Sequence, residues 1–130
     1  IVFGDWSSDV CSSDLDQTKI IFKQYKSIFN LGLDALENNN LEKLGMCMNK
    51  NHRLLQEIGV SCPELDDIVA KAIELGALGA KLTGTGRGGL VFALTSEIDL
   101  QSKVAAFFED RGYFVIKTQI DVFCHPACQP

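Results

Sequence analysis

The chain lacks any hydrophobic run that approaches the roughly 18 apolar residues of a membrane-spanning helix. It also lacks a secretory signal, because its first residues contain no basic segment and no apolar core of adequate length. Positive charge is not in surplus: 12 Lys and Arg stand against 17 Asp and Glu, for a formal net charge of −5. We therefore expect no membrane partner and no nucleic-acid partner.

The cysteines do not form the even, regularly spaced set that stabilises small secreted domains. There are five, scattered along the chain, a pattern that favours a reducing compartment and predicts a cytoplasmic protein. Cys124, His125 and Cys128 lie close together, but a structural zinc site needs four ligands and no partner pair stands elsewhere. We predict no metal site in this chain.

Three helices are predicted in the first part of the chain, which has 130 residues and is long enough for one domain. Apolar residues recur at steps of three and four over 16–37, 41–58 and 63–75, which gives each segment one apolar face. A turn of three asparagines separates the first two helices, so these should pair antiparallel. Gly59 and Gly76 stand where a C-terminal glycine is expected.

The third helix has a predicted N-terminal cap. Ser61 precedes Glu64 by three residues, and Pro63 lies near the first helical position. This arrangement predicts a capping box, in which the serine hydroxyl accepts a backbone N–H of the helix.

The second part of the chain alternates strands and a helix. Segments 80–83 and 90–94 are predicted strands, a helix begins at Ser96 or Asp99, and 113–120 is a predicted last strand with β-branched and aromatic residues. Three helices followed by strand, loop, strand, helix and strand indicate an α+β fold. Regular alternation, as in a doubly wound parallel sheet, is absent.

A glycine-rich loop at 84–89 is the stretch with chemical content. Four glycines in six residues allow positive φ and bring backbone N–H groups close to a ligand such as phosphate, although a tight hairpin also explains them. Gly84, Gly86 and Gly89 fit G-x-G-x-x-G, but a strand follows instead of the helix that a dinucleotide fold requires. No G-K-[ST] closes the loop, which excludes a Walker P-loop.

Residues 44–94 resemble the C-terminal part of the mevalonate kinases, a family of the GHMP kinase superfamily that also includes galactokinase, homoserine kinase and phosphomevalonate kinase. Two pieces carry the resemblance. Residues 59–66, G-V-S-C-P-E-L-D, are similar to the family's entry to a helix, and residues 76–89, G-A-L-G-A-K-L-T-G-T-G-R-G-G, are similar to its third conserved motif. The likeness extends over about 16–120 and is weakest before Leu41.

The resemblance implies a fold and a reaction. The fold would be a GHMP kinase C-terminal domain at 16–123, a ferredoxin-like antiparallel sheet with added helices, followed by an atypical tail at 124–130. The reaction would be transfer of the ATP γ-phosphoryl group to the 5-hydroxyl of mevalonate, assisted by Mg²⁺. In this family the N-terminal domain binds most of the ATP and Mg²⁺ and carries the catalytic Asp and Lys.

We therefore predict that this chain holds no catalytic residue and is inactive alone. Another GHMP kinase, such as a phosphomevalonate or homoserine kinase, and a free-standing domain that binds a ligand without catalysis remain alternatives. The sequence does not give the oligomeric state; family members are often dimers, so the resemblance allows a homodimer.

The candidate site residues follow from the third motif, which closes the site in this family. Arg87 stands where the family often has Gly, and either pairs with phosphate or is exposed at the loop tip. Lys81 either approaches phosphate or faces water. Asn51 and His52 either border the substrate pocket or simply pack on their helix. The predicted phosphate and substrate residues are Lys81, Thr83, Gly84, Thr85, Gly86, Arg87, Gly88 and Gly89.

The opening stretch 5–15, DWSSDVCSSDL, has no helical or strand periodicity. It resembles the translation of a common sequencing adapter, residue for residue. We predict that 1–15 is an artefactual or disordered tail, and that Trp6 and Cys11 have no role in a site.

Overall fold

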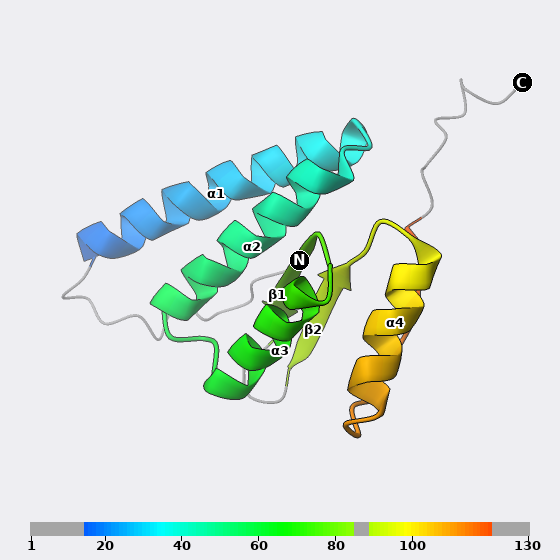
Figure 1. Cartoon of the computed structure of the whole chain (residues 1–130). Coiled ribbons are helices and arrows are strands. Elements are labelled where there is room, and N and C mark those ends of the chain that lie inside the picture. Colours follow the sequence, from blue (N-terminus) through cyan, green and yellow to red (C-terminus); the bar gives the residue numbers. More distant parts are fainter. Residues whose placement is uncertain (1–14, 85–88, 121–130) are drawn as a thin grey trace, which may run out of the picture.

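The computed structural model describes residues 15–84 and 89–120. Helices α1 and α2 lie side by side as a long pair, α3 lies on the sheet, and α4 lies beyond β2 (Figure 1). This arrangement confirms the predicted α+β class. The elements in chain order are α1 Leu15–Glu37, α2 Leu41–Glu57, α3 Pro63–Glu74, β1 Gly79–Thr83, β2 Leu90–Leu94 and α4 Ile98–Glu109.

The asparagine turn between α1 and α2 forms as predicted. Asn39 adopts a positive φ of 53°, a conformation that asparagine tolerates better than most residues. Asn40 caps α2, because its side-chain oxygen accepts the backbone N–H of Lys43 at 3.1 Å. The Lys43 ammonium also pairs with Asp34 of α1 at 2.9 Å, so the turn ties the two helices at one end.

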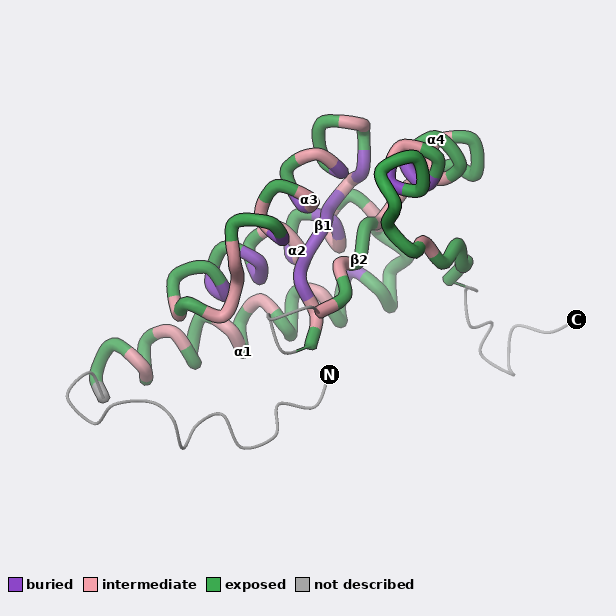
Figure 2. The backbone as a smooth tube through the Cα atoms, turned by 90° about the horizontal axis from the view of Figure 1, so that it is seen from below, coloured by how far each residue is buried: buried purple, intermediate pink, exposed green. Residues whose placement is uncertain are grey.

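Strand β1 lies at the centre of the fold. It pairs antiparallel with β2, in a register that runs from Gly79 opposite Leu94 to Thr83 opposite Leu90. β1 is buried along almost its whole length, whereas β2 is half exposed (Figure 2). One face of β1 meets α3 and α4 in a cluster of buried apolar side chains. This cluster comprises Val69, Ala72, Ala77, Ala80, Val104 and Phe108.

The edge of β1 that faces away from β2 is covered by side chains of α2. The Ala80 N–H donates to Asn49 Oδ1 at 3.0 Å, and the Leu82 N–H donates to His52 Nδ1 at 3.2 Å. The Asn49 amide also donates to the Leu78 carbonyl at 3.4 Å. Two side chains of a helix thus accept the N–H groups that a neighbouring strand would otherwise bind, which satisfies the buried backbone of β1.

The predicted last strand at 113–120 is wrong. This segment has no regular secondary structure and joins no ladder, and the described part of the chain holds a two-stranded sheet. Its apolar side chains are largely in solvent, Phe114 at 89% and Ile116 at 71% exposure. The Thr118 carbonyl accepts from the Gln101 side chain of α4 at 2.7 Å. Alternating apolar residues favour a strand only where a neighbouring strand offers backbone groups, and no described strand does so here.

The predicted capping box of α3 is also wrong. Cys62 is the N-cap and makes no side-chain capping bond. The Ser61 hydroxyl donates instead to the Asp66 carboxylate at 2.6 Å. The predicted helix ends are confirmed at Gly59 and Gly76, both of which adopt positive φ.

Helix α2 and strand β1 approach so closely that only glycine fits at the crossing. A Cβ atom on Gly45 would lie 2.6 Å from the carbonyl carbon of Leu78, and one on Gly79 would clash with the Gly45 backbone. Gly79 belongs to the motif at 76–89, so part of that motif serves helix packing.

Replacing Gly45 with Ala should lower the free energy of unfolding by about 1–3 kcal/mol, because α2 must move away from the β1 backbone. The control is Gly32→Ala in α1, whose Cβ would meet Cys47 at an ordinary 3.7 Å. That change should raise stability by about 0.5–1 kcal/mol, as expected inside a helix. Urea unfolding of the two variants measures both effects. Equal free energies of unfolding for the two variants would contradict the close approach of α2 and β1 at Gly45.

Candidate functional site

Strands β1 and β2, which flank the glycine loop, pair antiparallel, in agreement with the hairpin alternative for 84–89. Thr83 and Leu90 are opposite each other and close the ladder. Gly84 adopts a φ of +89° with no neighbour near its Cβ position, so the backbone conformation, and not crowding, requires glycine there. Thr85, Gly86, Arg87 and Gly88 lie outside the described residues, and their role in binding phosphate stays a prediction.

The sequence left open whether Lys81 approaches phosphate or faces water. The structure shows that it does not face water. It is only 7% exposed and lies opposite Phe92 in the ladder, on the sheet face away from Ala80 and Leu82. Its ammonium forms no ion pair or hydrogen bond with another described residue. Burial lowers the pKa of Lys81, because desolvation disfavours its charged form. This lysine is a buried cation without a described counter-ion.

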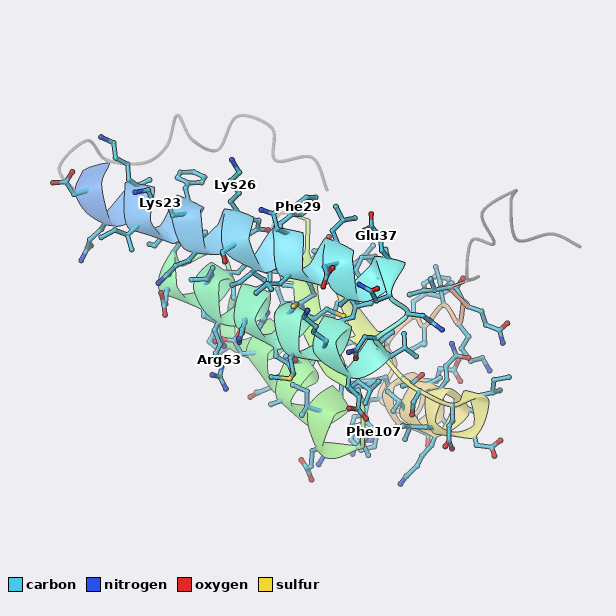
Figure 3. The ribbon with its side chains drawn as sticks, turned by 90° about the horizontal axis from the view of Figure 1, so that it is seen from above. Lys23, Lys26, Phe29, Glu37, Arg53 and Phe107 are labelled. Carbon is cyan, nitrogen blue, oxygen red and sulfur yellow. The ribbon has the colours of Figure 1, made fainter. Side chains whose placement is uncertain are left out.

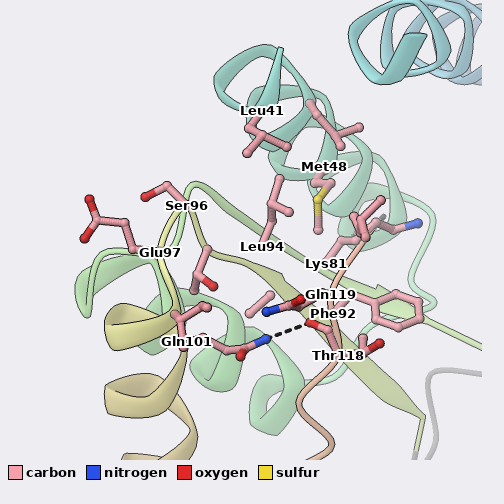
Figure 4. A pocket seen from close by; sticks show the side chains of 15 residues that line it. Leu41, Met48, Lys81, Phe92, Leu94, Ser96, Glu97, Gln101, Thr118 and Gln119 are labelled. Carbon is pink, nitrogen blue, oxygen red and sulfur yellow. Dashed lines mark hydrogen bonds between the residues drawn. The ribbon is translucent and has the colours of Figure 1, made fainter. Parts of the chain in front are cut away.

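Lys81 lines a cavity of about 560 Å³. Figure 4 shows Leu94 of β2 pointing toward Leu41 and Met48 of α2, with the hydrogen bond between Gln101 and Thr118 on the opposite side. The lining is mostly apolar and combines α2, both strands, the start of α4 and residues 118–120. Such a cavity suits a partly apolar group that also carries a negative charge for Lys81.

His52 is not at this cavity but is buried between α2, α3 and β1. Its Nε2 atom lies 2.9 Å from Asp66 Oδ1, and its Nδ1 atom accepts the Leu82 N–H. Both ring nitrogens are therefore engaged with the protein, which favours packing over the substrate contact considered for His52. Asn51 is buried near Tyr25 of α1, where burial raises the pKa of Tyr25 more than Asn51 lowers it.

Asp66 is the residue that sequence reasoning missed. Burial raises its pKa, but hydrogen bonds from Ser61, Gln56 and His52 together outweigh burial and lower it. The carboxylate therefore stays ionised at neutral pH, and both the Ser61 hydroxyl and the His52 ring bind its Oδ1 atom. The signal was present in the motif at 59–66, where a serine precedes an aspartate of the first helical turn, but it was interpreted only as a cap.

The described residues contain no group of three or more His, Cys, Asp or Glu side chains that could hold a metal ion. Across the same residues, no helix has the length and apolarity needed to cross a membrane. The chemistry that this part of the chain offers is a buried ammonium beside a cavity and a glycine hairpin.

Comparison with known families agrees with the geometry. Residues 33–113 match the family model described as GHMP kinases C terminal. This match covers more than half of the chain, so the chain belongs to the GHMP kinases and carries their C-terminal domain. The fold and family expected from the motifs at 59–66 and 76–89 are thereby confirmed.

The relatives include mevalonate kinases and galactokinases. The mevalonate kinase of Thermococcus sibiricus is 47% identical over 79 residues, which are 61% of this chain and 23% of that protein. The galactokinase of Pyrococcus furiosus is 41% identical over 93 residues, or 65% of this chain and 26% of that protein. The chain thus spans about a quarter of the length of these relatives.

Two solved structures share the fold. The L. major mevalonate kinase, solved in complex with R-mevalonate, superposes with a TM-score of 0.69 at 40% identity, over 73% of this chain and 29% of that one. The Methanococcus jannaschii mevalonate kinase gives a TM-score of 0.58 at 32% identity, over 71% and 27%.

Replacing Lys81 with Met should stabilise the ligand-free chain at pH 7, because methionine keeps most of the apolar stem and removes a buried charge. Since the folded-state pKa of Lys81 is lowered, its penalty is fully present below that pKa and disappears as the pH rises toward the unfolded value of about 10.4. The advantage of Lys81→Met should therefore shrink between neutral and alkaline pH.

Urea unfolding at pH 7 and at alkaline pH measures this change. The control is Lys103→Met, which removes an exposed lysine of α4. It should stay within about 0.5 kcal/mol of the parent chain at both pH values. A Lys81→Met chain that is less stable at pH 7 would show that the ammonium has a favourable partner.

Proposed function

We propose that this chain is the C-terminal domain of a mevalonate kinase, which transfers the γ-phosphoryl group of ATP to the 5-hydroxyl of mevalonate. The main support is its 40% identity and TM-score of 0.69 with the L. major mevalonate kinase, solved with R-mevalonate. The motif at 76–89 also supports it, because its strand Gly79–Thr83 pairs with Leu90–Leu94 across the glycine loop. We further propose that the whole enzyme is cytoplasmic.

Phosphoryl transfer depends mainly on positioning and on neutralising charge. In this proposal the glycine hairpin faces the phosphates and the buried ammonium of Lys81 stabilises an anionic group nearby. Arg87, within the loop, would pair with a phosphate through its planar guanidinium. When bound, Mg²⁺ would neutralise phosphate charge, and the rest of the parent protein would hold it together with most of the ATP.

The chain by itself should be catalytically inactive. It corresponds to about a quarter of its relatives, and the proposed catalytic Asp and Lys belong to the N-terminal domain. Lys81 and the glycine hairpin fit an anion, but the described residues offer no cluster of ligands for Mg²⁺. The contribution of this chain is therefore to complete and close a site.

Galactose is the second candidate substrate, since the P. furiosus galactokinase is 41% identical over 93 residues. A phosphomevalonate or homoserine kinase and a non-catalytic binding domain are further alternatives. The alternative kinases differ from a mevalonate kinase in the acceptor that is phosphorylated, and a non-catalytic domain would phosphorylate none, so a panel of acceptors separates them.

A chimaera in which residues 33–113 replace the matching segment of the T. sibiricus enzyme should phosphorylate mevalonate with ATP and Mg²⁺, and should not phosphorylate galactose. The 130-residue chain alone should give no turnover. Arg87→Ala in the chimaera should lower kcat/KM for ATP by roughly 10- to 100-fold, the effect of losing a charge-assisted hydrogen bond.

The matched control is Arg53→Ala, which removes an exposed arginine of α2 and should leave kcat/KM unchanged. A folded chimaera with no mevalonate activity, or one that prefers galactose, would contradict the proposed substrate. Turnover by the chain alone would contradict its proposed role as one part of the site.

The isolated chain should also self-associate. Helix α1 exposes apolar side chains, and Figure 3 shows its outer face, with Lys26 pointing away from α2. Phe29, Leu33 and Leu36 of α1 and Leu90 and Phe92 of β2 are all exposed. Such surface favours association. Light scattering should show a mass that rises with protein concentration. A constant monomer mass would contradict self-association.

A further inference from the structure

We propose that His52 is a positioning residue that fixes strand β1 through a hydrogen bond from the Leu82 N–H to its Nδ1 atom. This hydrogen bond requires the neutral Nε2–H tautomer of the imidazole. Protonation of the imidazole would break it. The Leu82 N–H donates to His52 Nδ1 at 3.2 Å, so Nδ1 must carry a lone pair. The ring proton is then on Nε2 and donates to Asp66 Oδ1 at 2.9 Å. The hydrogen-bond pattern assigns the tautomer.

The contacts of Asp66 fix the imidazole in this orientation. The Ser61 hydroxyl donates to the same carboxylate oxygen at 2.6 Å, so Asp66 is itself held in place. His52 is 3% exposed, and its ring joins α2 to α3 on one side and to β1 on the other. Leu82 precedes Gly84 by two residues, so its backbone lies where β1 leads into the loop.

Two side chains cap the edge of β1, and only one of them can titrate. Asn49 accepts the Ala80 N–H at 3.0 Å, and the asparagine amide does not change its charge with pH. His52 accepts the Leu82 N–H at Nδ1, which it can do only while that nitrogen carries no proton. Protonation of His52 would therefore affect the hydrogen bond of Leu82, whereas the hydrogen bond of Ala80, two residues earlier on β1, would not depend on pH.

The surroundings of the ring determine what protonation does. Among the described residues, the charged group in contact with the imidazole is Asp66 of α3. α1 contributes Tyr25, which packs on the neighbouring cluster of Leu55, Leu65 and Leu82. Lys81 of β1 lies on the opposite face of the strand from Leu82.

A protonated His52 would therefore keep its contact with Asp66. Its Nδ1 would become a donor that faces the Leu82 N–H, and that hydrogen bond would be lost. The expected effect is local, on the end of β1 near Leu82, while the contact between α2 and α3 remains.

Nuclear magnetic resonance of the ¹⁵N-labelled chain tests this inference without any substrate, so its outcome is independent of the proposed kinase activity. Long-range ¹H–¹⁵N spectra at mildly alkaline pH should show the Nε2–H tautomer of His52. As the pH falls, the Leu82 amide shift should follow the same midpoint as the imidazole, and Leu82 should lose roughly 2- to 10-fold protection from hydrogen exchange. The Ala80 amide is the internal control and should not follow that midpoint.

His52→Gln supplies the conservative variant, since glutamine can accept the Leu82 N–H and donate to Asp66. It should keep the protection of Leu82 and lose its pH dependence. His52→Leu should lose protection at every pH. If His52→Leu does not fold, the pH dependence of Leu82 protection in His52→Gln still tests the inference. An Nδ1–H tautomer, a Leu82 amide that ignores the His52 titration, or the same titration of Leu82 in His52→Gln would each overturn the inference.

Discussion

The structure depends on the burial of β1 on its faces and along its edges. One edge pairs with β2, one face packs against α3 and α4, and α2 closes the remaining edge through Asn49 and His52. Buried backbone N–H groups that lack an acceptor are costly, so these two side chains are as necessary to β1 as a neighbouring strand would be. The crossing of Gly45 and Gly79 allows α2 to come close enough to provide them.

The burial of β1 also explains why some residues of the motif at 76–89 serve the fold and others lie at the loop and the cavity. Gly76 ends α3, and Gly79 permits the close approach of α2, so these glycines serve the fold. Gly84 begins the loop with a positive φ and open space around it. Among the described residues of the motif, Lys81 carries a charge without a described counter-ion, and it lines the cavity. A single short segment thus connects the core of the domain to the surface that we propose meets phosphate.

Local patterns in the sequence were enough to predict the helices, both strands of the hairpin and the glycines that end α2 and α3. These features depend on periodicity and on positive φ, which neighbouring residues determine. The last strand was wrong because 113–120 has the composition of a strand but no described strand to pair with. The cap at Ser61 was wrong because its hydroxyl had a stronger acceptor, the Asp66 carboxylate. The burial of Lys81 and the contacts of His52 arise from tertiary packing, which no local pattern contains.

Native-state hydrogen exchange of the Ala80 and Leu82 amides is the measurement that most directly tests the central place of β1. If α2 closes this edge, both amides should exchange only through global unfolding and should be among the slowest in the chain at neutral pH. Fast exchange at both positions, with slow exchange confined to the helices, would show that this edge of β1 is open and would contradict the account.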